Sequence, residues 1–189
     1  RPKYQTAHRT ISLDGNSLLV IAALHYVAES GDTAFLQTHW DGLCRGVRWL
    51  EEHALGDDGL LHQGAYTDWA DSIARTGRIM YTNVLYWKAM SGLAEAAVSL
   101  QDTAAQTYWQ AKADHLREQI QSHFWREELG YFVTSQKYHN LSTSGNALAV
   151  AWDLATAEQS NSILDTMERL GMADPVPTQV VSYGYRRRH

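Results

Sequence analysis

Residues 80–100 read MYTNVLYWKAMSGLAEAAVSL, with apolar side chains around nearly the whole circumference of a helix. A helix that is apolar on all sides must be buried among other elements. Residues 17–29, SLLVIAALHYVAE, have the same character. The sequence STSGN opens a third apolar segment that extends from Ser142 to about Leu154. The chain therefore predicts three helices inside the molecule.

These segments belong to an internal repeat. Asn16, Asn83 and Asn146 stand near their starts at nearly equal intervals, each followed two residues later by a leucine. A more amphipathic helix is expected after each apolar one, across a short turn, at residues 33–53, 104–125 and 156–170. Such pairs cannot bury their apolar faces alone and must stack beside one another. We predict an all-α fold of stacked helical hairpins, curved into an arc with an inner and an outer layer.

The segments between the helices are short. Asp32 is expected to be the N-cap of the second helix, and the junction around Asp102 repeats that arrangement. Residues 130–133, Gly-Tyr-Phe-Val, predict a short strand that could form half of a hairpin. Residues 1–13 and 172–189 are expected to be irregular, and the 189 residues to form a single domain.

One connecting stretch carries more chemistry than a linker needs. Residues 67–81 read TDWADSIARTGRIMY, and place Asp68 and Asp71 on either side of Trp69. The apolar face of an indole matches the C–H face of a sugar, and a neighbouring carboxyl can protonate a glycosidic oxygen. The alternative is a solvated loop, in which Asp71 or Ser72 caps a short turn and the tryptophan packs on the core.

Composition excludes several classes of protein. The net charge is −5 and the only basic run is residues 186–188, which disfavours binding to nucleic acid. Cys44 is the single cysteine, so no internal disulfide is possible and a buried thiol is expected. No apolar run is long enough to span a membrane. We see no secretory signal, which predicts a cytoplasmic protein, and no initiator methionine, so the chain is expected to begin inside a longer or processed protein.

The nine histidines do not form a metal motif. None has His-Glu-x-x-His or another compact ligand spacing, so neither a metal nor another cofactor is predicted. Seven tryptophans and ten tyrosines are many for this length. The surplus favours a wall suited to sugars or other ring-shaped ligands.

The order of these motifs resembles a known family, the (α/α)6-toroid glycoside hydrolases. The likeness is closest to amylo-α-1,6-glucosidase and glycogen-debranching-type domains, with trehalase, neutral invertase and bacterial α-rhamnosidase further off. It begins with residues 14–18, Asp-Gly-Asn-Ser-Leu, and continues through residues 30–36, Ser-Gly-Asp-Thr-Ala-Phe-Leu. Residues 68–72, Asp-Trp-Ala-Asp-Ser, are similar to the debranching Thr-Trp-Met-Asp-Ala. Residues 77–87 are similar to the family's Gly-Lys-x-Val-Glu-x-Asn-x-Leu-Trp-Tyr.

The resemblance implies roles for particular residues. The aspartate of Trp-x-Asp is the family's general acid, which implies that Asp71 is catalytic, with Trp69 lining the sugar subsite. The other residues expected to bind substrate are Asp68, Asp14, Arg78, Tyr81 and Asn83. The chain departs from the debranching pattern at Asp68, which replaces a neutral residue, and at Tyr81, which stands in place of a glutamate.

The resemblance covers about half of a toroid, since a closed ring takes about twelve helices and six are expected here. It implies a glycoside hydrolase that cleaves an α-linked oligosaccharide or glycoside, with inversion. Inversion needs two carboxyls about 6.5–9.5 Å apart. Asp14 is the internal candidate for the second one, although it is also a plausible N-cap. The expected partners are a carbohydrate substrate and either a second copy of the chain or the missing remainder of the ring, with no nucleic acid or membrane.

Two other functions fit the same helices. A non-catalytic module of helical hairpins could bind protein or sugar on its concave face. A sugar epimerase or lyase on the same fold would use histidine bases, for which His62 and His25 are the candidates.

Overall fold

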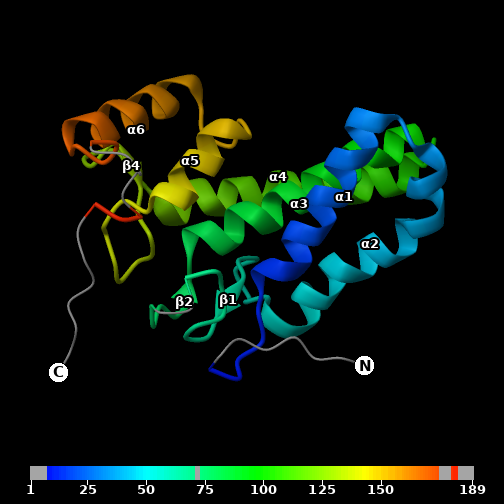
Figure 1. Ribbon diagram of the computed structural model, residues 1–189, viewed down its shortest axis with the longest axis horizontal. Coiled ribbons are helices and arrows are strands. Elements are labelled where there is room, and N and C mark those ends of the chain that lie inside the picture. The colour runs from blue at the N-terminus through cyan, green and yellow to red at the C-terminus, as the bar shows by residue number, and fades with distance from the viewer. Residues whose placement is uncertain (1–7, 71–72, 175–179, 183–189) are drawn as a thin grey trace.

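The computed structural model describes residues 8–70, 73–174 and 180–182. Within these ranges the chain forms three pairs of helices (Figure 1). They are α1 (Asp14–Ser30), α2 (Thr33–Ala54), α3 (Met80–Ser99), α4 (Thr103–Phe124), α5 (Thr143–Ala151) and α6 (Ala157–Arg169). The predicted fold of stacked helical hairpins is confirmed.

Helix α3 is the centre of the structure. It packs against α1, α2, α4 and α5, with the α1–α2 pair to its right and the α5–α6 pair at the upper left in Figure 1. Most of its side chains are buried, among them Val84, Leu85 and Leu93, each with no exposed surface. The prediction that residues 80–100 form an internal helix is therefore confirmed, and α1, α2, α4 and α5 pack around it.

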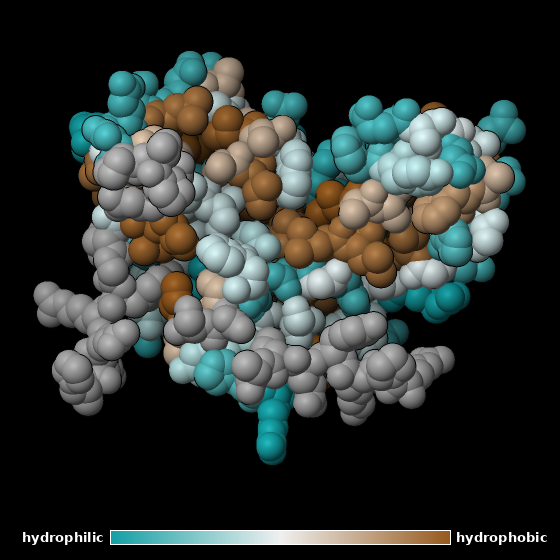
Figure 2. Space-filling view, viewed as in Figure 1, coloured by the Kyte–Doolittle hydropathy of each residue, from teal (hydrophilic) through white to brown (hydrophobic). Residues whose placement is uncertain are grey.

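The prediction that the first helix is buried on most sides is wrong for this chain. Leu18 and Leu19 on α1 keep 42% and 66% of their surface exposed. Only one side of α1 is covered, by α2 and α3, while Val20, Leu24 and Val27 face that core. Figure 2 shows apolar side chains gathered in the saddle between the α1–α2 and α5–α6 pairs. Among the described residues, other elements thus cover only part of the apolar surface of α1.

The helix junctions repeat as predicted. Asp32 and Asp102 are N-caps, and each accepts a hydrogen bond of 2.9 Å from the main-chain N–H three residues later. Each follows a residue in the left-handed region, Gly31 with φ 70° and Gln101 with φ 58°. This turn geometry reverses the chain between α1 and α2 and between α3 and α4.

Two small antiparallel hairpins precede the central and third inner helices. Strand β1 (His62–Gln63) pairs with β2 (Gly77–Arg78), and β3 (Trp125–Arg126) pairs with β4 (Tyr131–Phe132). Strand β4 confirms the strand predicted at 130–133. The sequence did not predict β1 and β2, because two-residue polar strands have no alternating pattern. They bring the two ends of the Trp69 loop together.

The repeated asparagines fasten each of these hairpins to its helix. Asn83 donates to the carbonyls of Ile79 and Leu61 and accepts from the N–H of Leu61 at 2.7 Å. Asn146 makes the same three bonds in the next hairpin, to the carbonyls of Ser142 and Phe132 and from the N–H of Phe132. On α1, the equivalent residue Asn16 instead donates to the Gly46 carbonyl on α2.

Two further expectations concern Cys44 and membrane-spanning helices. Cys44 is buried, as predicted, and its desolvation raises the pKa of the thiol. Among the residues that the structure describes, no helix has the length and apolar content to cross a membrane.

Candidate functional site

Trp69 forms an exposed aromatic surface at the N-terminal end of the inner helices. Its side chain keeps 48% of its surface exposed, and its ring meets the Tyr81 ring edge-on, with centroids 6.4 Å apart. Its main-chain N–H donates to the carboxylate of Asp14 at 2.8 Å. The alternative that Trp69 packs onto the core is therefore not what the structure shows. An exposed indole held at its backbone is suited to stack on a sugar ring.

Asp14 is the residue that holds this surface to the helices. It lies in the first turn of α1 and is buried. Its other oxygen accepts from the Ser12 hydroxyl at 2.6 Å, and the Tyr81 hydroxyl lies 3.5 Å from the oxygen that Trp69 uses. The N-cap alternative for Asp14 is wrong, because Leu13 holds that position and no side chain caps the helix. A carboxylate here is also favoured by the helix dipole.

Tyr81 lies beneath the indole, in the first turn of α3. It packs with Ile79 and Leu85 and keeps only 6% of its surface exposed. Burial, together with the charges of Asp14 and Asp68, raises the pKa of its hydroxyl well above the ordinary value. Tyr81 therefore stays a neutral phenol that donates to Asp14. Its predicted stacking on a sugar stays a prediction, since little of the ring is accessible.

Asp68 anchors the loop. It is buried, and its two oxygens accept from Nε and Nη2 of Arg75, both at 2.9 Å. Gln63 and the main-chain N–H of Ala70 complete its hydrogen bonds. The predicted contact between Asp68 and substrate stays a prediction, and it is not supported by the protein donors that occupy both of its oxygens. A buried carboxylate needs a paired cation and saturated oxygens, and both come from the protein.

Arg75 was not among the predicted site residues. It has no exposed surface, and its guanidinium lies 5.9 Å from the centre of the Tyr81 ring. It therefore links the far side of the loop to both Asp68 and α3. A buried arginine is rare unless it is paired, but its partner could not be read from the sequence.

Asn83 also serves the fold. It has no exposed surface, and both atoms of its amide group bond to the main chain. The predicted contact between Asn83 and a sugar stays a prediction, and it is not supported by the bonds that occupy its amide group, to the main chain of Leu61 and Ile79. Its position at the inner end of a core helix agrees with the resemblance.

Arg78 is engaged elsewhere. Its Nε donates to the carboxylate of Asp58, in the turn that follows α2. His62 and His123 approach the same carboxylate at 3.5 and 3.6 Å. The Arg78 side chain is 31% exposed and its guanidinium is bonded within this cluster, so a contact between Arg78 and a sugar stays a prediction.

Asp71 and Ser72 lie outside the described residues. The structure gives the flanks of this segment, Ala70 and Ile73, but no position for the carboxyl group predicted to be the general acid. Asp71 therefore stays a prediction from sequence.

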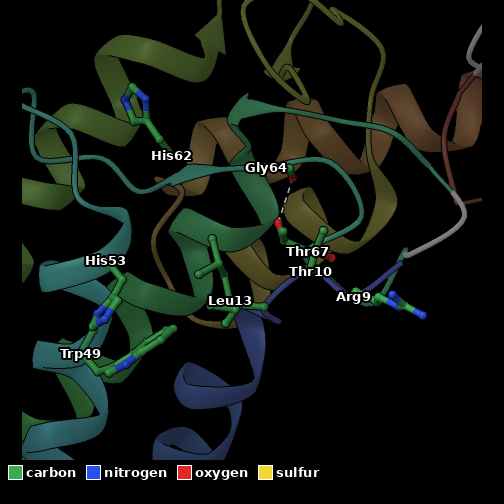
Figure 3. A pocket seen from close by; sticks show the side chains of 9 residues that line it. Arg9, Thr10, Leu13, Trp49, His53, His62, Gly64 and Thr67 are labelled. Atoms are coloured by element: carbon green, nitrogen blue, oxygen red, sulfur yellow. Dashed lines mark hydrogen bonds between the residues drawn. The ribbon is translucent and has the colours of Figure 1, made fainter. Parts of the chain in front are cut away.

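A hollow of about 390 Å³ lies beside the start of the loop, near Thr67 (Figure 3). It is lined by Arg9, Thr10, Ile11, Leu13, Trp49, His53, His62, Gly64 and Thr67. Trp49 and His53 stack there at 4.3 Å. Neither Trp69 nor Tyr81 lines it, so it is a different surface from the aromatic platform. Among the described residues that line it, the acid–base side chains are histidines and Arg9, and none is a carboxyl that could protonate a glycosidic oxygen.

The two candidate histidine bases do not lie at one site. His62 lines the hollow, whereas His25 is exposed on α1 and is not part of its wall. In the described part of the chain, no group of three His, Cys, Asp or Glu side chains is placed to hold a metal ion.

Three stacked helical hairpins with an exposed indole at one rim agree with the resemblance to the toroid glycoside hydrolases. Comparison with known proteins specifies it further. Residues 2–172 match the family described as the bacterial alpha-L-rhamnosidase 6 hairpin glycosidase domain, and the chain belongs to that family. The predicted toroid glycosidase class is thereby confirmed. The likeness to amylo-α-1,6-glucosidase is corrected, since the match is to a relative predicted to be more distant.

Solved structures show the same fold. A rhamnosidase from Klebsiella oxytoca with rhamnose bound superposes with a TM-score of 0.72 at 16% identity, over 90% of this chain and 32% of its own. A rhamnosidase of glycoside hydrolase family 78 from Bacillus sp. GL1 gives 0.72 at 21% identity, over 90% and 18%. A sialidase gives 0.64 at 18% identity, over 77% and 14%. The chain thus spans a third or less of each of these proteins. No curated protein matches it in sequence.

Proposed function

We propose that this chain is the six-hairpin part of a glycoside hydrolase that cleaves α-L-rhamnosides. The observation that carries the proposal is the exposed Trp69, whose backbone is bonded to Asp14 on α1, in a chain of the rhamnosidase family. The indole supplies an apolar face for a pyranose, and Tyr81 supports it from below. The rhamnose bound by the Klebsiella relative supports the choice of sugar.

In this proposal Asp71 is the general acid that protonates the leaving oxygen. It stands two residues after Trp69, so it is tied to the same short loop. The buried pair of Asp68 and Arg75 holds that loop against the helices. Preorganisation of this kind stabilises a transition state without reorganisation during the reaction. A water activated by a second carboxylate would then attack the opposite face of the sugar and invert the anomeric centre.

The second carboxylate is proposed to come from elsewhere in the protein. Asp14 and Asp68 are the acidic side chains bonded to the Trp69 loop among the described residues, and both are buried with protein donors on both oxygens. Neither is arranged to activate a water. The same observation favours a second candidate function, in which this chain binds the sugar and takes no part in the chemistry.

The experiment uses the protein that carries this chain. Wild type and Asp71→Asn are assayed on aryl α-L-rhamnosides and aryl α-D-glucosides, and proton NMR follows the anomer first released. We expect the rhamnoside to be cleaved with inversion, and kcat to fall by roughly 100-fold or more in the variant. Unchanged hydrolysis by Asp71→Asn would remove Asp71 from the chemistry and leave the sugar-binding function. Retention of configuration would overturn the inverting mechanism.

A further inference from the structure

Three residues occupy the same place in the three helical hairpins. Asp14, Tyr81 and Ser144 each stand two residues before the repeated asparagine, in the first turn of α1, α3 and α5. The first two already belong to the site around Trp69. The third hairpin therefore contributes Ser144 to the same row of helix ends.

The local frames of the second and third hairpins are the same. Asn83 and Asn146 each bond to the carbonyl four residues before them and to both main-chain groups of one residue in the preceding hairpin. Identical hydrogen bonds fix the first turn of each helix in one orientation. Ser144 therefore has the same position relative to α5 and its β-hairpin as Tyr81 has relative to α3 and its β-hairpin.

The two helix ends are in direct contact. Gly145 is buried, and a Cβ at that position would lie 3.2 Å from Cγ of Met80 and 3.4 Å from the main-chain nitrogen of Tyr81. The glycine is what allows α5 to approach α3 this closely. The residue before it is therefore beside the turn that carries Tyr81.

The apolar contacts below this row agree. Leu148 lies one helical turn after Ser144, on the same face of α5. It packs against the cluster of Ile79, Tyr81 and Leu85, as does Ile21, which lies two turns after Asp14 on α1. Helices α1 and α5 thus each pack one face against the Tyr81 cluster of α3, and Ser144 lies at the N-terminal end of that face of α5.

The Ser144 hydroxyl is suited to meet a ligand. The residue is half-buried, and its hydroxyl lies 3.3 Å from the hydroxyl of Ser142, which is buried. A hydroxyl that shares one hydrogen bond with a neighbour keeps further donor or acceptor capacity. At a helix N-terminus it is also close to main-chain N–H groups that have no partner within the helix.

We propose that Ser144 is a further substrate-binding residue, whose hydroxyl bonds a hydroxyl of the sugar on the α5 side of the Trp69 platform. The inference rests on the proposed function, because it assumes that a sugar lies on that platform. It extends the site from the loop and α1 to the third hairpin. The position would then select among sugars by the hydroxyl or substituent that faces α5.

The test compares Ser144→Ala and Ser144→Leu with wild type in the protein that carries this chain. Loss of one neutral hydrogen bond is expected to raise KM for an aryl α-L-rhamnoside about three- to tenfold, with kcat within about twofold. The leucine should raise KM further, because its side chain occupies the space of the sugar. Ser91→Ala on α3, which removes a hydroxyl that meets Glu95, is the matched control and should leave KM unchanged.

The outcomes separate the two proposals. Wild-type hydrolysis of the rhamnoside tests the proposed function, and the ratio of variant to wild-type KM tests Ser144. KM values within about twofold of wild type for both variants, with unchanged thermal unfolding, would overturn the role of Ser144 alone. If wild type cleaves another glycoside, the same ratio measured on that glycoside decides. If it neither cleaves a glycoside nor binds L-rhamnose by NMR titration, both proposals are overturned.

Discussion

The main-chain N–H of Trp69 donates to the carboxylate of Asp14 across 55 positions of sequence, at 2.8 Å. Through this bond the first turn of α1 determines where the exposed indole stands. The same oxygen lies 3.5 Å from the hydroxyl of Tyr81 on α3. The platform is therefore set by two inner helices and not by the loop alone.

Replacement of Asp14 should separate positioning from stacking. Asp14→Ala removes the acceptor from Trp69, and we expect KM for the rhamnoside to rise about tenfold because the loop loses its attachment to α1. Asp14→Asn keeps one carbonyl oxygen and should lose less. Steady-state kinetics measure both. Equal kinetics of Asp14→Ala and wild type would show that the indole is held by other contacts.

Replacement of the indole itself should act on binding. Trp69→Ala removes the apolar face, and stacking on an aromatic ring is worth about 1–3 kcal/mol, or roughly 5- to 150-fold in KM. Trp69→Phe should restore part of the loss. Trp49→Ala, in the separate hollow, serves as the control with an indole removed from another surface. A larger effect of Trp49→Ala on KM would place the substrate in that hollow.

The buried ion pair of the loop should be costly to break from one side. Asp68→Asn leaves the guanidinium of Arg75 without its counter-charge in a site with no exposed surface. We expect a loss of about 3–5 kcal/mol in the free energy of unfolding. Urea unfolding of the protein followed by tryptophan fluorescence measures it. The double variant Asp68→Leu with Arg75→Met should recover much of the loss, and failure to do so would assign the loss to packing.

The helices could be predicted closely from the sequence because their signals are local. The expected segment 33–53 is observed as Thr33–Ala54, and the expected N-cap Asp32 bonds to the third residue beyond it. Helix periodicity and caps depend on residues within a few positions of each other. The class of fold followed from the same signals, because three apolar helices, each with an amphipathic partner, must stack.

The site could be predicted only in part, because its contacts are not local. Asp68 and Asp14 look alike in sequence, yet one is neutralised by Arg75 and the other holds Trp69. A carboxylate's role depends on which cation or N–H the fold brings to it. The burial of Asn83 was equally hidden, although its recurrence at 146 was the signal that it had a structural role.

The repeated asparagines give a paired prediction. Asn83→Ala and Asn146→Ala each leave the main-chain N–H and carbonyl of one hairpin residue buried without a partner. The expected cost is about 2–4 kcal/mol for either variant. Asn16→Ala is the matched control, because Asn16 makes one bond of 3.2 Å to α2 and should cost about 1 kcal/mol or less. Equal losses of unfolding free energy for all three variants would contradict the role of Asn83 and Asn146 in holding each β-hairpin to its helix.

The cluster around Asp58 predicts how stability depends on pH. Burial and then the Arg78 guanidinium lower the pKa of His123 below 6.5, in spite of the nearby Asp58 carboxylate; Arg126 and His62 lower it further. The folded state therefore binds this proton less readily than the unfolded chain. The contribution of neutral His123 to the stability of the folded state is present above about pH 6.5 and is lost as the pH falls through the lowered pKa of the folded state.

The measurement is the free energy of unfolding between about pH 5 and 8 for wild type and His123→Gln. Although burial opposes it, the main-chain N–H of Leu60 and the Arg78 guanidinium lower the pKa of Asp58 overall, so that carboxyl stays charged across this range. We expect wild type to lose stability toward pH 5 with a steeper slope than the variant, which has no imidazole to protonate. Parallel slopes would mean that His123 takes up its proton equally in the folded and unfolded states, and the acid sensitivity would then have to come from another group.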